Sequence, residues 1–171
     1  LPLTAIQILW VNFFTDSFPA IALAFEDGID YLLLRPSRAR GELIDKEMRF
    51  LIAVIGMPTS VLLFGIYYWM LRSGFEPTMT RTFIFASFGT YSLFLVFAVR
   101  SLHKSIFTYN PFSNPYLVAG TGIGITCMLG AIYLPILQEA LHTVALPPVW
   151  LLGIFAVGIV NILSIEAGKW W

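Results

Sequence analysis

The chain has 171 residues, of which 58% are hydrophobic and 12% are charged, and its formal net charge is zero. A soluble domain carries roughly 25% charged residues, so a single globular core with a polar surface is excluded. Without a positive net charge there is no electrostatic reason for nucleic acid to bind, and we expect no such partner. The long uncharged stretches instead indicate an integral, multi-pass membrane protein whose surroundings are the lipid bilayer.

The apolar residues fall into five segments, each near the roughly 20 residues that a helix needs to cross a bilayer. These segments are continuously apolar and do not alternate, which excludes the strands of a membrane barrel. We therefore predict an all-α fold, a polytopic transmembrane bundle of about five helices. In chain order the predicted spans are about 4–25, 48–71, 82–99, 116–134 and 149–165, with a cytoplasmic loop at about 26–47.

The first predicted span carries polar residues near its middle. Asp16 lies about a dozen residues into it, hence about 18 Å along the helix. An acid at this depth costs about 2.5–3.5 kcal/mol on insertion scales, so it must face protein, water or an ion. Asn12 lies one turn earlier on the same helix face, with Thr15 close by. The oxygen atoms of these three residues suit a hard cation such as Ca²⁺, Mg²⁺, Na⁺ or K⁺, or a proton carried on the carboxyl.

Pro19 adds a backbone effect to this span. It lacks the N–H that would bond the carbonyl of Thr15, and its ring crowds the same carbonyl. The first helix is therefore predicted to be kinked or unwound near Asn12–Pro19. Irregular backbone at membrane depth is tolerated where it lines a cavity or is buried in protein. From chemistry alone, the alternative that Asp16 and Asn12 only hydrogen-bond a neighbouring helix stays open.

The later part of the chain offers fewer candidates. Gly120, Gly122 and Gly124 form a predicted small-residue face in the fourth span, which would let helices approach closely. His103 and His142 lie in predicted loops without a cysteine or second histidine beside them, so no zinc site is predicted. The sequence also lacks a Gly-rich phosphate loop and a nucleophile elbow. We predict no catalytic and no cofactor-binding residue in this chain.

The orientation follows from Lys and Arg residues near the ends of the spans. Two basic residues, Arg72 and Arg81, fall on one side of the predicted bundle. The C-terminus is therefore predicted to be cytoplasmic, in the plasma membrane or an endomembrane, with Leu1 on the outer side. Eight basic residues fall on the cytoplasmic side: Arg35, Arg38, Arg40, Lys46, Arg49, Arg100, Lys104 and Lys169.

Several stretches resemble one known family. The segment from Pro2 to Ala20 reads PLTAIQILWVNFFTDSFPA, which resembles the sixth transmembrane helix of type II P-type ATPases, a pattern close to P-L-x-x-x-Q-x-L-W-x-N-L-x-T-D-G-x-P-A. The segment from Arg35 to Ile44, RPSRARGELI, is similar to the loop that follows that helix. The later segments VRSL, FSNPYL and IYLP, beginning at Val99, Phe112 and Ile132, are similar to the family's late helices. The resemblance covers nearly the whole chain.

The resemblance implies that the chain forms helices six to ten of a calcium-pump-like cation pump. In the family, Asn, Thr and Asp of the sixth helix supply oxygens to the transported ions, and these carry over to Asn12, Thr15 and Asp16. Reticulum-type calcium pumps place a Glu on the eighth helix, where this chain has Ser92, which favours one ion per cycle. Ser17 stands where the family usually has Gly.

The resemblance also implies parts that this chain does not contain. ATP and Mg²⁺ act only in the full-length protein, whose N-terminal helices and cytoplasmic phosphorylation domain would be partners of this chain. Ca²⁺ takes six to eight oxygen ligands, and this piece offers three or four. The preferred reading is the membrane half of an ATP-driven Ca²⁺ exporter. The alternatives are an H⁺, Na⁺ or Mg²⁺ pump of the same family, or a non-catalytic membrane scaffold protein.

Overall fold

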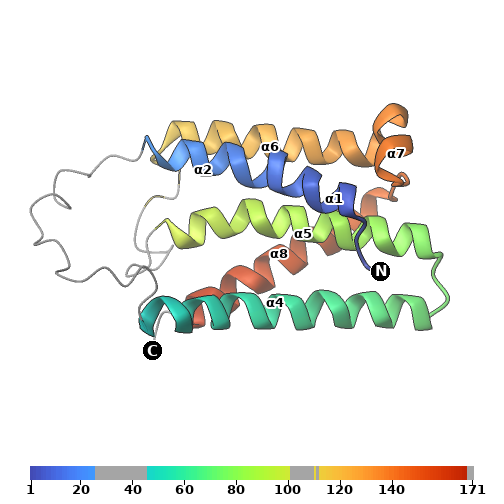
Figure 1. Ribbon diagram of the computed structural model, residues 1–171, viewed down its shortest axis with the longest axis horizontal. Coiled ribbons are helices and arrows are strands. Elements are labelled where there is room, and N and C mark those ends of the chain that lie inside the picture. The colour runs from blue at the N-terminus through green and yellow to red at the C-terminus, as the bar shows by residue number, and fades with distance from the viewer. Residues whose placement is uncertain (26–45, 101–109, 111, 169–171) are drawn as a thin grey trace, which may run out of the picture.

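The computed structural model describes residues 1–25, 46–100, 110 and 112–168, and every regular element within them is a helix (Figure 1). The predicted all-α fold is therefore confirmed. The predicted loop at about 26–47 lies outside the described residues except for Lys46 and Glu47, which begin a helix. In chain order the elements are α1 (Ala5–Trp10), η1 (Val11–Asp16), α2 (Ser17–Leu23), α4 (Lys46–Arg72), α5 (Pro77–Val99), α6 (Pro115–Tyr133), α7 (Pro135–Leu141) and α8 (Pro148–Gly168).

Four stretches of described helix are long and apolar enough to cross a membrane, and they coincide with the first, third, fourth and fifth predicted spans. The second predicted span falls within α4, a single helix of 27 residues, or about 40 Å at 1.5 Å per residue. It is not among the four, so its membrane crossing stays a prediction. The four stretches are Ala5–Leu23, Pro77–Ala98, Pro115–Tyr133 and Pro148–Ala167.

Four helices begin at a proline, and each of these prolines marks the point where a new helix starts after a turn or loop. A proline at the first helical position loses no hydrogen bond there, because that N–H has no partner within the helix, and its fixed φ suits the helix. The turn between α4 and α5 also contains Gly74, whose φ of 82° lies in the left-handed region. The four prolines are Pro77 of α5, Pro115 of α6, Pro135 of α7 and Pro148 of α8.

Helix α5 lies at the centre of the bundle and contacts α4, α6, α8 and η1 (Figure 1). Its buried residues Phe83, Ile84 and Ala86 pack with Met70 of α4 and Ile154 of α8 in one apolar cluster. On another side, Phe85 packs with Val11 of η1 and Met128 of α6. Because α5 joins both clusters, it fixes the position of η1 relative to α4 and α8.

A buried polar contact joins α4 to α8 within this apolar interior. The Thr59 hydroxyl donates to Asn161 Oδ1 at 2.7 Å, and Asn161 Nδ2 donates to the Val157 carbonyl at 2.9 Å. Thr59 and Asn161 are both buried. Hydrogen bonds of this kind between membrane helices contribute about 0.6 kcal/mol on average. The contact therefore specifies which faces of α4 and α8 meet more than it stabilises the bundle.

Helix α7 is an element that the sequence pattern did not predict. It begins at Pro135, with one residue between it and the end of α6, and ends at Leu141, followed by the C-cap residue His142, whose φ of 53° is left-handed. The Gln7 side chain of α1 is fully buried, and its Nε2 donates to the Leu141 carbonyl at 3.1 Å. Gln7 also forms a capping box with Thr4 at the start of α1. The glutamine of the first motif thus ties the start of α1 to α7.

Asn114 connects the start of α6 to the end of α2. Its Oδ1 accepts from the Leu117 N–H at 3.0 Å as the N-cap of α6, and its Nδ2 donates to the Ala22 carbonyl at 3.3 Å. One buried amide therefore serves two helices, which explains why this position in the FSNPYL segment carries an asparagine.

Substituting Asn114 by Ala is expected to destabilise the protein, because it removes the cap and leaves buried polar groups without a partner. Loss of an N-cap costs about 0.5–2 kcal/mol. Asn114→Ser keeps a capping oxygen and loses the bond to Ala22, so its effect should be smaller. Thermal unfolding of the full-length protein in detergent measures both variants. Equal losses for both would show that the cap contributes nothing.

Candidate functional site

The first span contains a π-helical turn, η1, between the α-helical segments α1 and α2. Pro19 explains its position. In a regular α-helix the proline ring would press against the Thr15 carbonyl, and proline has no N–H to donate to that carbonyl. A π turn adds a residue to the helical repeat and relieves that contact. The predicted departure from a regular helix near Asn12–Pro19 is found, as a widened turn instead of a break.

The π turn changes which residues lie over one another. Its backbone hydrogen bonds join residues five apart instead of four, so η1 has more residues per turn than a regular α-helix. Val11 is fully buried, whereas Asn12 lies on the exposed side of the bundle. The Ser17 hydroxyl follows the same spacing and donates to the Asn12 carbonyl at 2.9 Å. The polar residues of η1 differ in burial: Asn12 is exposed, Asp16 is half-buried and Thr15 is buried.

The three predicted site residues have different surroundings. Thr15 is 0% exposed, and its hydroxyl donates to the Val11 carbonyl at 2.7 Å, which leaves the oxygen lone pairs as acceptors. Asp16 is half-buried, and its carboxyl lies within hydrogen-bonding reach of the Ser92 side chain on α5. The structure brings Thr15 and Asp16 together against α5 and leaves Asn12 facing outward.

Helix α5 approaches η1 closely at a glycine. A Cβ built on Gly89 would lie 3.6 Å from Thr15 Cγ2 and would collide with the Met128 side chain of α6. Gly89 and Ser92 are three residues apart and so share a face of α5. The spacing of Gly89 and Ser92 can be read from the sequence, but the sequence does not indicate that Gly89 contacts Thr15.

Helix α6 packs against η1 and α2 through two of the three glycines of the predicted small-residue face. A Cβ on Gly120 would lie 3.0 Å from the Phe18 carbonyl oxygen of α2, and one on Gly124 would lie 3.4 Å from the Phe14 carbonyl oxygen of η1. The Gly124 Cβ would also collide with the Leu93 side chain of α5. Gly122 has no atom within 4 Å of its built Cβ, so its inclusion in the face was wrong. A residue two positions from Gly120 points to the other side of a helix.

The described oxygen groups are too few to enclose a cation. They comprise the Asp16 carboxylate, the Thr15 and Ser92 hydroxyls and the outward Asn12 amide. No cluster of three or more His, Cys, Asp or Glu side chains that could hold a metal exists among the residues that the structure describes. Since Ca²⁺ takes six to eight oxygens, this arrangement can supply one wall of an ion site and needs further ligands from elsewhere.

Comparison with known proteins shows which family the chain resembles. The family model described as "Cation transporting ATPase, C-terminus" matches residues 1–171. A calcium-transporting ATPase of Bacillus subtilis is 35% identical over 154 residues, which cover 86% of this chain and 17% of that protein. Calcium-transporting ATPase 1 of Yarrowia lipolytica is 30% identical over 148 residues, with 85% of this chain and 16% of the relative covered.

A mammalian relative gives the same picture. Calcium-transporting ATPase type 2C member 2 of Mus musculus is 35% identical over 149 residues, which cover 83% of this chain and 15% of that protein. The chain thus spans between 15% and 17% of the length of these three relatives. Because the family model covers every residue and the relatives match most of them, the chain belongs to the type II P-type cation-transporting ATPases, as a C-terminal part of their membrane region.

Proposed function

We propose that this chain is the membrane part of an ATP-driven Ca²⁺ pump and that Asn12, Thr15 and Asp16 supply oxygen ligands to the transported ion. The observation that carries the proposal is the half-buried Asp16 carboxyl beside a π turn, midway along a helix long enough to span a membrane. A carboxylate at that depth is retained where it meets a partner or a transported ion. The relatives named as calcium-transporting ATPases favour Ca²⁺.

The position of Asn12 supports an ion site completed by other helices. Its amide lies on the exposed side of the described bundle, next to the exposed Phe13. An amide facing hydrocarbon is costly, whereas an amide facing further oxygen-bearing helices can act as a ligand. The missing ligands would come from the part of the protein outside this chain.

We also propose that the pump moves one Ca²⁺ per cycle. Asp16 brings one formal negative charge, and Ser92 beside it is neutral. A second divalent ion in the same space would need another acid to offset its charge. Helix α5 supplies no such acid, because its residues from Pro77 to Val99 include neither Asp nor Glu.

The rest of the mechanism belongs to the remainder of the full-length protein. There, ATP and Mg²⁺ would act at a cytoplasmic phosphorylation domain, which we propose as a partner of this chain. We propose a cytoplasmic C-terminus, in a plasma membrane or endomembrane. The end of α8 lies at the same end of the bundle as the start of α4 and the end of α5 (Figure 1). Arg49 lies in the first turn of α4 and Arg100 directly follows α5, which agrees with an excess of basic residues on the cytoplasmic side.

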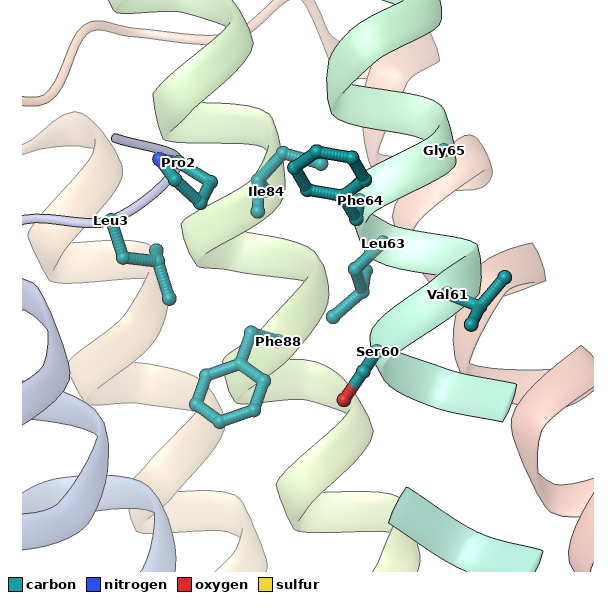
Figure 2. A pocket seen from close by; sticks show the side chains of 9 residues that line it. All are labelled: Pro2, Leu3, Ser60, Val61, Leu63, Phe64, Gly65, Ile84 and Phe88. Atoms are coloured by element: carbon teal, nitrogen blue, oxygen red, sulfur yellow. The ribbon is translucent and has the colours of Figure 1, made fainter. Parts of the chain in front are cut away.

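The N-terminal helices would pack into an open groove of about 680 Å³ between the start of the chain, α4 and α5 (Figure 2). Over four-fifths of each relative lies outside the matched region, and the family model places the match at the C-terminus. Residues Pro2 and Leu3 line the groove, so a helix that precedes them can turn directly into it. The other lining residues are Ser60, Val61, Leu63, Phe64, Gly65, Ile84 and Phe88.

Disulfide cross-linking in the full-length protein tests whether an N-terminal helix occupies this groove. A cysteine at Phe64, paired with single cysteines along the helix that precedes Leu1, should form an intramolecular cross-link on mild oxidation. A cysteine at Leu152 of α8, which is 72% exposed and does not line the groove, is the control and should not cross-link to that helix. Both variants carry Cys127→Ser. A cross-link at Leu152 but none at Phe64 would place the helix elsewhere.

The function itself is tested by ATP-dependent uptake of radioactive Ca²⁺ into vesicles that contain the full-length protein. Phosphoenzyme formation is measured in parallel with Ca²⁺, Mg²⁺ and Na⁺ and over a range of pH. We expect Ca²⁺ to be required and one ion to be bound per phosphoenzyme. Dependence on H⁺, Na⁺ or Mg²⁺ would assign another cargo, two ions would overturn the stoichiometry, and no phosphoenzyme would indicate a scaffold.

A further inference from the structure

The Ser17 hydroxyl forms a hydrogen bond whose spacing differs from that of hydroxyls in the regular helices. It donates to the Asn12 carbonyl, five residues earlier, at 2.9 Å. In an α-helix a serine or threonine hydroxyl reaches the carbonyl three or four residues earlier. The five-residue spacing is that of a π turn, so the Ser17 bond fits η1 in its π form. Hydroxyls of α5, α6 and α8 bond four residues back at 2.9 Å: Thr82 to Thr78, Thr126 to Gly122 and Ser164 to Val160.

The Ser17 bond spans all three proposed ligands. Asn12, whose carbonyl accepts, and Ser17, whose hydroxyl donates, lie at its two ends, with Thr15 and Asp16 between them. The Thr15 hydroxyl bonds Val11, four residues earlier, at 2.7 Å. The five-residue side-chain bond is therefore found at the end of the turn, directly after Asp16. A hydrogen bond in this place restricts how the backbone that carries the ligands can rearrange.

The backbone at Ser17 does not require glycine, although the family pattern has Gly at this position. Ser17 has a φ of −68° and a ψ of −43°, which are ordinary right-handed helical values. A glycine there would have no hydroxyl and would leave the backbone freer. The serine therefore adds two restraints to η1: the side-chain bond to Asn12 and a narrower range of backbone conformations.

The helices on the two sides of η1 are each held by a buried amide. Gln7 Nε2 of α1 donates to the Leu141 carbonyl at 3.1 Å, and Asn114 Nδ2 donates to the Ala22 carbonyl of α2 at 3.3 Å. Both amide side chains are buried. With α1 and α2 held in this way, the positions of the proposed ligands depend on the form of η1 itself.

We propose that Ser17 is a positioning residue for the ion site. Its hydroxyl, bonded to the Asn12 carbonyl, holds η1 in the π form and keeps Thr15 and Asp16 in place before the cation arrives. This inference rests on the proposed function, since it takes these residues as ligands. Ligands that are already ordered lose less conformational freedom when the ion binds, so the ion binds more tightly. Ser17 acts through the backbone and does not itself touch the ion.

The first measurement is phosphoenzyme formation from ATP by the full-length protein at graded Ca²⁺ concentrations. Ser17→Ala removes the bond and should raise the Ca²⁺ concentration for half-maximal formation by about 3- to 10-fold, with the maximal level unchanged. Ser17→Thr keeps the hydroxyl and should match the wild type. Ser17→Gly also frees the backbone and should raise the concentration further than Ser17→Ala does.

Ser164→Ala is the matched control. The Ser164 hydroxyl also donates to a backbone carbonyl at 2.9 Å, but it does so in the regular helix α8 with the four-residue spacing. Its loss removes the same kind of bond away from η1, so the Ca²⁺ dependence should stay that of the wild type. The dependence on ATP should not change in any of these variants.

Hydrogen–deuterium exchange of the full-length protein in detergent without Ca²⁺ separates positioning from direct ligation. The backbone of residues 11–18 should exchange about 3- to 10-fold faster in Ser17→Ala than in the wild type, because the bond holds the turn before any ion binds. Ser164→Ala should leave the exchange of this segment unchanged. Wild-type exchange in Ser17→Ala would show that the hydroxyl does not hold the turn and would overturn the proposal, whatever the variant does to Ca²⁺ binding.

The proposed function and the positioning role fail differently. If Asp16→Asn keeps the wild-type Ca²⁺ dependence, the proposed ion site is wrong, and the positioning role is lost with it even where exchange shows that Ser17 holds the turn. If Asp16→Asn loses Ca²⁺ dependence while Ser17→Ala matches the wild type, the ion site stands and only the positioning role is overturned. A lower maximal level in both Ser17→Ala and Ser17→Thr would indicate a packing role and would also overturn it.

Discussion

Replacing Asp16 by Asn in the full-length protein is expected to raise the Ca²⁺ concentration for half-maximal phosphoenzyme formation by about 100-fold or more. The substitution keeps the size and one oxygen of the side chain but removes its negative charge. Losing one member of a close charge pair in a desolvated site costs about 2–5 kcal/mol, and each 1.4 kcal/mol is a factor of ten. Phosphoenzyme formation at graded Ca²⁺ concentrations measures the shift.

Glu139→Gln is the matched control for the loss of a carboxylate. Glu139 lies on the exposed side of α7, away from η1, so its neutral variant should keep the wild-type Ca²⁺ dependence. The Asp16→Asn variant should still fold, because an amide at this half-buried position can keep the bond with Ser92. If both variants bound Ca²⁺ as the wild type does, the Asp16 carboxylate would not be a ligand.

The sequence predicted the irregular helix but not its form. An acid at mid-span followed three residues later by Pro19 is enough to predict a departure from the α-helix, because the missing N–H and the ring contact are local effects. Whether the chain then kinks, breaks or widens into a π turn depends on what packs against it. Here α5 and α6 contact η1 on two sides, and the widened turn keeps Val11 and Thr15 buried between them.

The predicted shared face of Asn12 and Asp16 depended on the form of this helix. A four-residue spacing predicts a shared face in a regular α-helix, but η1 is a π turn, which has more residues per turn. In the structure Asp16 is half-buried and Asn12 is exposed, so the two side chains have different surroundings. The residue types of the site could be predicted from the sequence, whereas their directions required the structure.

Contacts between distant segments were also beyond the sequence pattern. The resemblance pointed to Ser92 by its place along the chain, whereas only the structure shows that α5 contacts η1. Gly89 could not be predicted as a contact of Thr15, because the position of a single glycine in an apolar helix does not indicate which other helix it contacts. Helix α7 was missed because a segment of seven residues is too short to show a helical period.

The contact between α6 and α2 is where a small substitution should have a large effect on stability. A Cβ on Gly120 would lie 3.0 Å from the Phe18 carbonyl oxygen and 3.2 Å from its carbonyl carbon. Both neighbours belong to a helix backbone, which cannot move aside as a flexible side chain can. Gly120→Ala is therefore expected to destabilise the protein by about 1–3 kcal/mol, the usual effect of overpacking, and Gly120→Val by more.

Gly122→Ala is the control that separates the steric effect at Gly120 from the general effect of replacing a glycine by alanine within a helix. Gly122 lies on the exposed side of the same helix with nothing within 4 Å of its built Cβ, so alanine there should be tolerated or should stabilise the helix. Thermal unfolding of the full-length variants in detergent gives the order: Gly122→Ala at or above wild type, then Gly120→Ala, then Gly120→Val. Because Phe18 is the second residue after the π turn, the Gly120 variants should also weaken Ca²⁺ binding. Equal stability of the two alanine variants would mean that α6 and α2 are not in close contact in the membrane.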